Sequence, residues 1–561
     1  MKPAPAWRSR LWLATALLLT GYKLWLTRGQ GLYAIGATPQ DDRLYLELAH
    51  HLIHGSWLGN YNELTLAHGP FYPLFIAAVF GLGVPLVLAQ QVFYAVACAW
   101  FARALRPAVT SAGARCAIYL LLLWNPMTFD AATLGRVLPQ HIYVPLGLTI
   151  FASLAALYLR RDRPARQQAG WAVLLGLAGG ACYLTRENGG WLAPGLVLLG
   201  GACLHGAWRI SRKTFHRTAR LLALATVVAA VPVLFVCVEN KRNYGWFGTT
   251  EARSATFARA YATMQRVRAG ADLPGVPVTR AAREAMARVS PRFDGLQREF
   301  DAVNDPGWAG STELLIRRPV AAGETGAGVF PRVLRAASAR AGNYGDAGHA
   351  HYFYKHLARE LDLAIEQGGL TTGPRTVDLG GGNTLGTAVA FADAVISFSR
   401  FSARPPPSTG TADELNFFRD MTGERLSPPV GELDVVGAAE YVQNLAKVDR
   451  LHAIGKMLRP VLLGLVIVAL VIGTVRVVLA FKRRRWTFAL TLAAAAELVI
   501  AAALLQFARI EVTAWPVFSI ITFAPLYPLV LVFVAAVLWD AIAAWRGRPV
   551  STGNEASSVS V

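Results

Sequence analysis

Residues Gln40–Ala49 read QDDRLYLELA and come soon after the first hydrophobic segment of the chain. They place two adjacent carboxylates, Asp41 and Asp42, close to a stretch that is apolar enough to enter a membrane. With Asp41 as the N-cap, the spacing predicts a short helix that ends at Gly55. The apolar positions on one face of this helix are Tyr45, Leu48, Ala49 and Leu52. This stripe predicts a helix that lies along the bilayer surface and holds both acids where water meets lipid.

The composition is that of a protein with many membrane spans. Of 561 residues, 54% are hydrophobic and 16% are charged. Several apolar runs are long enough to cross a hydrocarbon core about 30 Å thick. The net charge of +20 would also suit nucleic-acid binding, but the basic residues cluster between the apolar runs, where cytoplasmic loops carry them. We therefore expect a lipid bilayer as a partner and no nucleic acid. The five cysteines lie in or at the ends of apolar runs, which indicates packing rather than disulfides.

The charges that flank the apolar runs predict the topology. The basic N-terminus favours the cytoplasm, so the first span, Leu11–Thr27, delivers residues 28–70 to the outside. No small-residue cleavage pattern follows this span, so we expect it to be retained rather than removed as a signal peptide. Lys23 and Trp25 are interpreted as anchors at the membrane interface.

The next apolar stretch is too long for one upright span. Arginines after it favour the cytoplasm, so we predict an interfacial or re-entrant helix over Phe71–Leu82 and the second span over about Leu86–Trp100. Further spans are expected at about 115–129, 141–159, 169–185, 190–206, 219–238, 459–480, 487–507 and 515–543. About ten spans result, with both termini in the cytoplasm, in an inner (plasma) membrane.

The expected fold is a polytopic α-helical membrane protein with a mainly helical extracytoplasmic domain inserted before the last three spans. Amphipathic patterns in that domain lie near 253–268, 277–289, 349–367 and 432–453. The predicted units are an N-terminal transmembrane module (1–239) with the first outer loop as its catalytic part, the soluble domain (240–456), the C-terminal transmembrane helices (457–546) and a disordered cytoplasmic tail (547–561).

A second motif, HGPFYP at His68–Pro73, ends the first outer loop. The order of the two motifs resembles the opening of the GT-C membrane glycosyltransferases, in particular the branch that contains the aminoarabinose transferases and the protein O-mannosyltransferases. In that branch an outer loop with an acidic pair, an aromatic residue about four positions later and a short juxtamembrane helix follow the first span. Asp41-Asp42-x-x-Tyr45 matches this opening, whereas His68 stands where the aminoarabinose transferases have lysine. The resemblance covers residues 1 to about 240, and the last three spans in outline.

The resemblance implies transfer of a sugar from a polyprenyl-phosphate donor to an extracytoplasmic acceptor, which is a glycan, a lipid or a protein, by a single inverting displacement. Such transfer needs a base for the acceptor proton, positive groups for the leaving phosphate and a dry groove. Asp41 and Asp42 are the candidate catalytic residues: Asp41 is a candidate base, and the two acids together are candidate ligands of a divalent cation, Mg or Mn. The alternative is that Asp41 only caps the helix and Asp42 is a first-turn charge.

Other polar residues near the outer ends of spans are candidates for substrate contact. Arg186 is the best phosphate ligand, or else it pairs with Glu187 at the interface. Asp130 resembles the second acidic position of the family, or else is an ordinary loop aspartate. The predicted substrate-binding set is Tyr45, His68, Tyr72, Asp130, Arg186, Glu187 and Arg509. Gln140 and His141 begin a span, so either they touch substrate or they mark the interface.

Two functions of other classes remain open. One is a transporter or flippase that moves a carrier-linked sugar without chemistry; charged residues along a path through the spans would favour it. Glu497 is an acid in the middle of a predicted span, and we interpret it as an inward-facing residue with a structural partner. The other is a membrane-anchored receptor or assembly factor in which the soluble domain is the working part. The position of the acid pair outside the spans favours chemistry instead.

Overall fold

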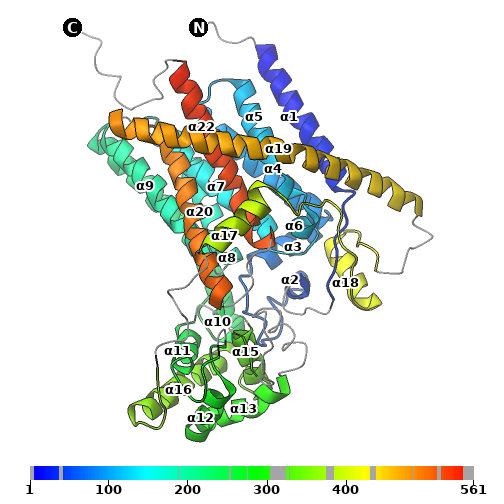
Figure 1. Cartoon of the computed structure of the whole chain (residues 1–561), viewed down its shortest axis with the longest axis vertical. Helices are drawn as coiled ribbons and strands as arrows, with labels where there is room; N and C mark the ends of the chain where they lie inside the picture. The colour runs from blue at the N-terminus through cyan, green and yellow to red at the C-terminus, as the bar shows by residue number, and fades with distance from the viewer. Residues whose placement is uncertain are drawn as a thin grey trace.

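The computed structural model describes residues 6–36, 42–186, 189–251, 254–273, 276–303, 324–326, 329–373, 384–429, 438–483, 486–513 and 520–546. Within these ranges the regular structure is helical, with three isolated β-bridges. The helices form a large bundle and, at one end of it, a smaller group, the lower group, which runs from α11 (Ala255–Met264) to α16 (Ala347–Glu366) (Figure 1). The start of α1 (Ala6–Thr27) and the end of α22 (Tyr527–Trp545) lie at the opposite end of the molecule (Figure 1).

Seven helices of the described chain are long and apolar enough to cross a membrane. These stretches, each with the helix that contains it, are Leu86–Ala104 (α4), Gln140–Leu159 (α7), Gly189–Trp208 (η2 and α9, Ala193–Trp208), Arg212–Tyr244 (α10), Gln443–Arg483 (in α19, Ala438–Arg483), Phe488–Arg509 (in α20, Phe488–Thr513) and Ile521–Trp545 (with α22, Tyr527–Trp545). The protein is therefore a multi-pass membrane protein. Three more predicted spans are helices too, α1 (Ala6–Thr27), α5 (Ala112–Leu123) and α8 (Ala165–Thr185), so the count of about ten stays a prediction.

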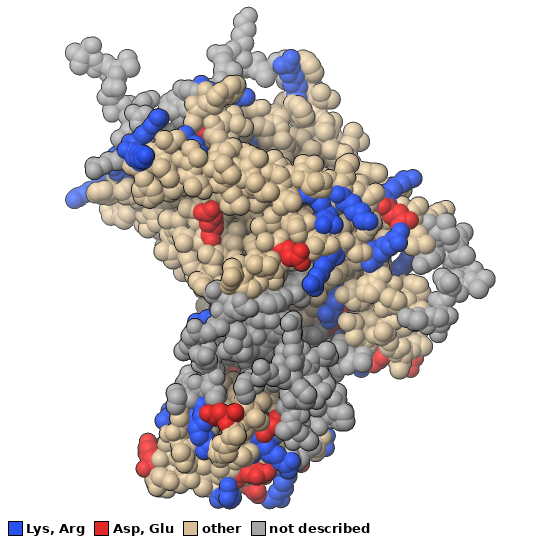
Figure 2. All heavy atoms as spheres, viewed as in Figure 1, with Lys and Arg blue, Asp and Glu red and all other residues tan. Residues whose placement is uncertain are grey.

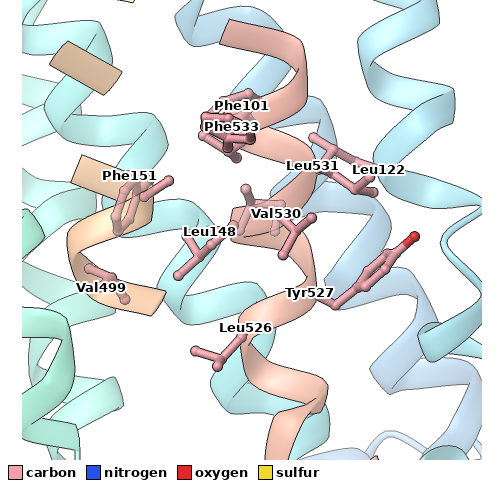
Figure 3. Close-up of a cluster of buried hydrophobic side chains, with 14 of the residues drawn as sticks. Phe101, Leu122, Leu148, Phe151, Val499, Leu526, Tyr527, Val530, Leu531 and Phe533 are labelled. Atoms are coloured by element: carbon pink, nitrogen blue, oxygen red, sulfur yellow. The ribbon is translucent and has the colours of Figure 1, made fainter. Parts of the chain in front are cut away.

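The centre of the bundle is α7, which is apolar on all sides and buried on all sides. It packs against α4 and α8, and a helix without a polar face is stable only in such a position. Leu148 and Phe151 of α7 belong to the same hydrophobic core as Phe101 of α4 and Phe533 of α22 (Figure 3). Figure 2 shows a largely uncharged surface over this part of the molecule.

Four shorter helices gather near one end of the bundle. They are α2 (Asp42–Ile53), α3 (Phe71–Gly81), α6 (Ala131–Leu134) and α18 (Ala412–Thr422). The two helices predicted in the first part of the chain, after Asp41 and over Phe71–Leu82, are thus confirmed as helices. Tyr45, Leu48 and Ala49 are buried as the apolar stripe requires, and Gly55 follows the helix with a φ of 74°. Where α2 and α3 lie relative to a bilayer stays a prediction.

The lower group of helices has a hydrophobic core of its own. It consists of α11 (Ala255–Met264), α12 (Arg280–Val289), α13 (Pro291–Val303), α15 (Phe330–Arg340) and α16 (Ala347–Glu366). In contrast, α17 (Thr384–Phe391) and α18 contribute Phe391 and Phe418 to cores of the bundle. Residues 438–453 of the pattern near 432–453 and the span at 459–480, which were predicted separately, belong to one continuous helix, α19.

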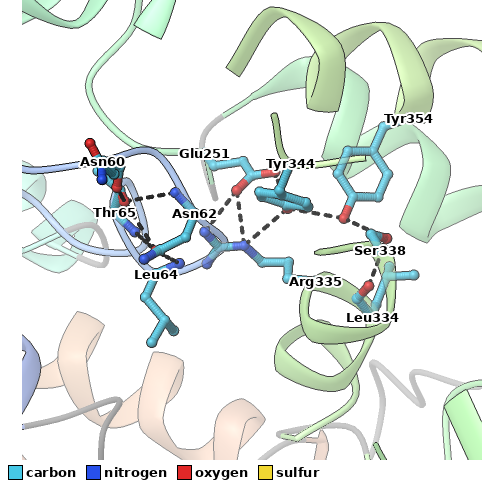
Figure 4. Close-up of polar contacts among 10 residues, drawn as sticks. All are labelled: Asn60, Asn62, Leu64, Thr65, Glu251, Leu334, Arg335, Ser338, Tyr344 and Tyr354. Atoms are coloured by element: carbon cyan, nitrogen blue, oxygen red, sulfur yellow. Dashed lines mark hydrogen bonds and ion pairs between the residues drawn. The ribbon is translucent and has the colours of Figure 1, made fainter. Parts of the chain in front are cut away.

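A polar junction joins the lower group to the bundle. Glu251, just after α10, forms an ion pair of 2.7 Å with Arg335 of α15 and accepts a hydrogen bond from the Tyr344 hydroxyl (Figure 4). The backbone N–H of Glu251 donates to the carbonyl of Leu66, in the loop after α2, at 3.0 Å. The Tyr61 ring, from the same loop, stacks on Tyr344 with 5.7 Å between centroids. The loop between α2 and α3 therefore contacts both parts of the molecule.

Two interpretations of charged residues in spans are wrong. Lys23 is fully buried rather than interfacial, because its Nζ donates to the Leu123 carbonyl and to Thr128 Oγ1, both at 2.7 Å, and so fastens α1 to the end of α5. Glu497 is exposed on the surface of α20 and does not face the inside of the bundle. All five cysteines are buried and free, as their positions in apolar runs predicted.

Candidate functional site

The first residue of α2, Asp42, forms a two-pronged ion pair with Arg136. Its Oδ1 lies 2.7 Å from Nη2 and its Oδ2 lies 2.9 Å from Nε. The Asp42 side chain has no exposed surface, and that of Arg136 is 15% exposed. Parallel N–H···O bonds of this kind fix both groups in one plane and are stronger than a single contact. The pair therefore attaches the beginning of α2 to the loop between α6 and α7.

A close backbone contact holds the loop that carries Arg136. The N–H of Tyr33 donates to the Gly135 carbonyl at 2.7 Å. A Cβ at Gly135 would lie 2.9 Å from the Tyr33 ring, so this approach requires glycine. Burial raises the pKa of Tyr33, with Arg136 acting against the shift and the nearby Asp42 adding to it. The phenol therefore stays protonated beside the ion pair.

Asp130 is buried and fully engaged with backbone amides. Its Oδ1 accepts from the N–H groups of Ala132 (2.9 Å) and Thr133 (3.3 Å), which caps α6. Its Oδ2 accepts from the N–H of Ser402 at 3.0 Å, in a segment 272 residues away. Burial raises the pKa of Asp130 to about 6, and these hydrogen bonds limit the rise. In this arrangement Asp130 joins α6 to the segment before α18.

Three predicted substrate-binding residues lie together. The ring of Tyr45, on α2, lies 5.5 Å from that of His68 and 5.2 Å from that of Tyr72, between centroids. Tyr72 is fully buried, and its hydroxyl accepts a hydrogen bond of 2.9 Å from Gln90 Nε2 of α4. The two sequence motifs, about 25 residues apart, therefore meet in one aromatic group beside the Asp42 end of α2.

The loop of His68 also approaches the end of α8. A Cβ at Gly69 would lie only 1.9 Å from the Leu184 carbonyl oxygen, so the two backbones are in direct contact. Arg186, the C-cap of α8, follows two residues later and lies over the ring of Tyr143, with 5.9 Å from its Cζ to the centroid. This contact brings Arg186 to the same end of the bundle as His68.

A small cavity of about 40 Å³ lies between the ends of α4, α6, α7 and α22. Gln140 and His141 both line it, as do Gln90 and Gln91. The His141 ring contacts the Arg136 carbonyl through Nε2 at 3.1 Å. The cavity therefore adjoins the ion pair on one side and the aromatic group, through Gln90, on the other.

Three of the predicted site residues are not brought together with this group. Asp41 and Glu187 lie outside the described residues. Arg509 is exposed near the end of α20. Among the residues that the structure describes, no group of three or more His, Cys, Asp or Glu side chains is placed to hold a metal ion. Both oxygens of Asp42 accept from Arg136, and the divalent cation predicted for Asp41 and Asp42 stays a prediction.

Arg136 and the two glutamines of α4 were not predicted from the sequence. A signal for Arg136 existed, because it lies on a loop predicted to be outside, where arginine is less frequent than on cytoplasmic loops. No comparable signal marked Gln90 and Gln91, since polar residues near the end of a span also occur at membrane interfaces. Only the fold shows which cavity they line.

The comparisons with known proteins gave matches to solved structures alone. No protein-family model matches the chain, and no curated protein matches its sequence. The crystal structure of ArnT from Cupriavidus metallidurans bound to undecaprenyl phosphate aligns with 96% of this chain and 79% of its own, at 14% identity and a TM-score of 0.32. The apo crystal structure of the same protein aligns with 75% of this chain and 89% of its own, at 16% identity and a TM-score of 0.31. Matches at this TM-score assign no activity.

Proposed function

We propose that this protein is a membrane glycosyltransferase of the GT-C type that moves a sugar from a polyprenyl-phosphate donor to an acceptor outside the cytoplasm. The observation that carries the proposal is the meeting of the two motifs: α2 begins at a buried Asp42 fixed by Arg136, and its Tyr45 contacts His68 and Tyr72 of the second motif. This group is built at one end of a multi-pass bundle, and we propose that a lipid-borne donor and a water-borne acceptor meet there.

The proposed reaction is a single displacement at the anomeric carbon of the donor. An acceptor hydroxyl forms the new C–O bond while the bond to phosphate breaks, and polyprenyl phosphate leaves with inversion. Asp42 is occupied by Arg136, so we assign it the role of positioning the loop of Arg136, and we assign the acceptor proton to the neighbouring Asp41. Arg186 and His68 supply positive charge or hydrogen-bond donors for the leaving phosphate.

The proposed orientation places this end of the bundle outside the cytoplasm. The lower group of helices, α11 to α16, then forms a domain outside the cytoplasm, on the side from which the acceptor arrives. The alternative of a transporter that works without chemistry gains no support from Glu497, because this side chain is exposed on the surface of α20.

Sugar transfer in isolated membranes tests the proposal. Wild type is compared at matched expression with Asp41→Asn and Asp42→Asn, with lipid extracts as the donor source. We expect Asp41→Asn to lower the rate by about a hundredfold or more, as for loss of a positioned base. Asp42→Asn should also lower the rate, because it removes the charge that holds the loop of Arg136. Asp162→Asn, at an exposed aspartate, serves as the control and should leave the rate unchanged. A transferase activity that both site variants retain would show that the site is assigned wrongly.

A further inference from the structure

Arginines gather at the end of the bundle that lies away from the candidate site. Because α4 and α7 both begin beside the small cavity near that site, their C-terminal ends lie on the far side of the bundle. Residues 103–115 and 160–166, at these two ends, contain a single acidic residue, Asp162. The same two stretches contain seven arginines: Arg103, Arg106, Arg115, Arg160, Arg161, Arg163 and Arg166. This end of the bundle therefore carries a large excess of positive charge.

One of these side chains, Arg160, is held in place by the end of α4. Its Nη1 donates to the Ala104 carbonyl at 2.8 Å, and its Nη2 donates to the Arg103 carbonyl at 3.0 Å. Its guanidinium lies over the Trp171 ring of α8, with 5.2 Å from Cζ to the ring centroid. The Trp171 ring contacts that of Trp100, on α4, with 5.5 Å between centroids. Arg160 therefore joins the ends of α4, α7 and α8.

The neighbouring arginines are close enough to act on Arg160. Burial lowers the pKa of Arg160, and the positive charges of Arg103, Arg106 and Arg163 lower it further. Arg163 has Asp162 at 3.9 Å, whereas Arg160 lies between like charges. Arginines on cytoplasmic loops normally turn into water, but Arg160 is fixed and half-buried. Arg103, Arg106 and Arg160, which we call the arginine group, are thus like charges held together, and an anion would relieve their repulsion.

An apolar stripe on α4 leads up to the arginine group. Val92, Val96 and Trp100 are spaced by four residues, so they share one face of the helix. These side chains are 42%, 44% and 36% exposed, as expected for a face that meets lipid. Arg103 continues the same face at the end of α4. A free phosphate ion would contact the arginines alone, whereas a phospholipid would contact both the arginines and the stripe.

We propose that the arginine group and the apolar stripe of α4 form a binding site for one anionic phospholipid. The phosphate of the lipid lies among the three guanidinium groups, and one acyl chain lies along Val92, Val96 and Trp100. The bound lipid compensates the positive charge where α4, α7 and α8 meet, so it stabilises the folded bundle. This inference does not depend on sugar transfer, because the site lies at the other end of the bundle.

The test uses the full chain purified in detergent, to which phosphatidylglycerol or phosphatidylcholine is added. Native mass spectrometry counts the bound lipids, and thermal unfolding gives the Tm. We expect one phosphatidylglycerol to stay bound and to raise the Tm. Phosphatidylcholine, which has no net charge, should bind at least about tenfold more weakly. Inorganic phosphate at the same concentration should leave the Tm nearly unchanged, because it cannot use the stripe.

The double variant Arg103→Gln/Arg106→Gln removes two charges of the arginine group and leaves the backbone carbonyls that hold Arg160. It should weaken phosphatidylglycerol binding by about tenfold or more. Arg212→Gln/Arg220→Gln is the matched control, because it removes two exposed arginines from α10. The first part of α10 lies at the same end of the bundle, since Arg217 Nη2 donates to the Arg161 carbonyl at 2.5 Å. This control should bind phosphatidylglycerol as wild type does.

A second pair of variants tests the stripe without changing any charge. Val96→Asn places an amide in the middle of the stripe and should weaken phosphatidylglycerol binding by about fivefold, as loss of buried apolar contact does. Val197→Asn makes the same change at a valine of α9 that is 73% exposed, and it should have no effect on this binding.

The outcomes decide the proposal in both directions. Loss of binding in the arginine and stripe variants, with both controls like wild type, would support a lipid site at this place. Equal binding of the two lipids by wild type, or equal loss in the arginine variant and its control, would overturn it. Stabilisation by inorganic phosphate that matches the effect of phosphatidylglycerol would replace the lipid with a free anion and would also overturn it.

Discussion

Asp42 and Arg136 form an ion pair of which one member has no exposed surface. Arg136→Gln would leave that carboxylate buried without its counter-charge, which typically costs about 3–5 kcal/mol. We therefore expect a clear fall in the Tm of the purified protein in detergent. The double variant Asp42→Asn/Arg136→Gln should recover part of this loss, because it removes the unpaired charge.

Arg163→Gln is the control for this prediction. Arg163 lies 3.9 Å from Asp162, and both side chains are more than half exposed. Exposed pairs contribute about 1 kcal/mol or less, so the Tm should hardly move. Equal Tm values for Arg136→Gln and Arg163→Gln would show that the buried pair does not hold α2 in place.

Asp130 predicts a pH dependence. Burial raises its pKa from an ordinary 3.8 to about 6, so the folded protein binds this proton more tightly than the unfolded chain does. Between about pH 4 and pH 6 the contribution of Asp130 to the free energy of unfolding therefore falls as the pH rises, by up to about 3 kcal/mol in total. Well above pH 6, the contribution of Asp130 to the free energy of unfolding no longer changes with pH.

Asp130→Asn isolates this contribution, because an amide does not titrate. We expect the Tm of wild type to rise relative to that of Asp130→Asn as the pH is lowered from 7 to 5, measured by thermal unfolding in one detergent. Asp162→Asn, at the exposed aspartate, should follow wild type throughout. Parallel curves for wild type and Asp130→Asn would contradict the raised pKa.

Local sequence signals located the first motif but not its partner. The acid pair, the aromatic spacing and the stripe with Tyr45 were enough to predict α2. Arg136 lies 94 residues from Asp42, and Asp130 contacts Ser402 across 272 residues. Such pairings depend on how helices pack, which periodicity does not encode. The residues of a site could thus be proposed one by one, whereas their hydrogen bonds could not.

The contact between the His68 loop and α8 depends on one glycine. A methyl group at Gly69 would lie 1.9 Å from the Leu184 carbonyl oxygen, so Gly69→Ala must push the loop away from α8. We expect a loss of about 1–3 kcal/mol in stability, as for other overpacked positions. Since His68 and Arg186 flank this contact, we also expect a higher KM for the donor in the transfer assay.

Gly81→Ala, at the end of α3, is the control because a Cβ at that position would meet no other atom of the described chain within 4 Å. It should be neutral or slightly stabilising. Should Gly69→Ala match Gly81→Ala in both Tm and KM, the loop and α8 would not be in the contact that we describe.

Helix boundaries show the same limit of sequence reasoning. The positions of α3, α7 and α20 follow from apolar runs and flanking charges, and the predicted ranges are close to those observed. The first turn of α4 is different: its N-cap residue, Pro85, makes no capping bond, and Glu424 supplies one instead by accepting from the N–H of Val87 at 2.8 Å. Burial raises the pKa of Glu424 to about 7. A cap contributed 337 residues away leaves no trace in the local sequence.

The two parts of the molecule meet at the Glu251–Arg335 junction. The lower helices bury their own apolar side chains, so they do not need the bundle to complete a core. Polar contacts orient the lower helices relative to the bundle. They are the ion pair, the hydrogen bond from the Tyr344 hydroxyl and the backbone hydrogen bond from Glu251 to Leu66. Nearby charge from Glu251 raises the pKa of Arg335 even though burial alone would lower it. The arginine is thus charged at any working pH.

Arg335→Met should therefore loosen the junction without unfolding the lower helices. It leaves Glu251 buried at 8% exposure with a phenol as its remaining side-chain partner, and a buried carboxylate without a counter-charge is unstable. We expect faster limited proteolysis of residues 245–255 and an unchanged helical signal in circular dichroism. The loop between α2 and α3 carries Leu66 and, two residues later, His68, so a loosened junction should also lower sugar transfer. Arg259→Met removes an exposed pair with Asp362 on the same group of helices and should change neither readout.

Two results would contradict this prediction. Loss of helical signal in Arg335→Met would mean that the ion pair supports the core of the lower helices. Unchanged proteolysis would mean that the apolar contacts of Tyr61 hold the two parts together.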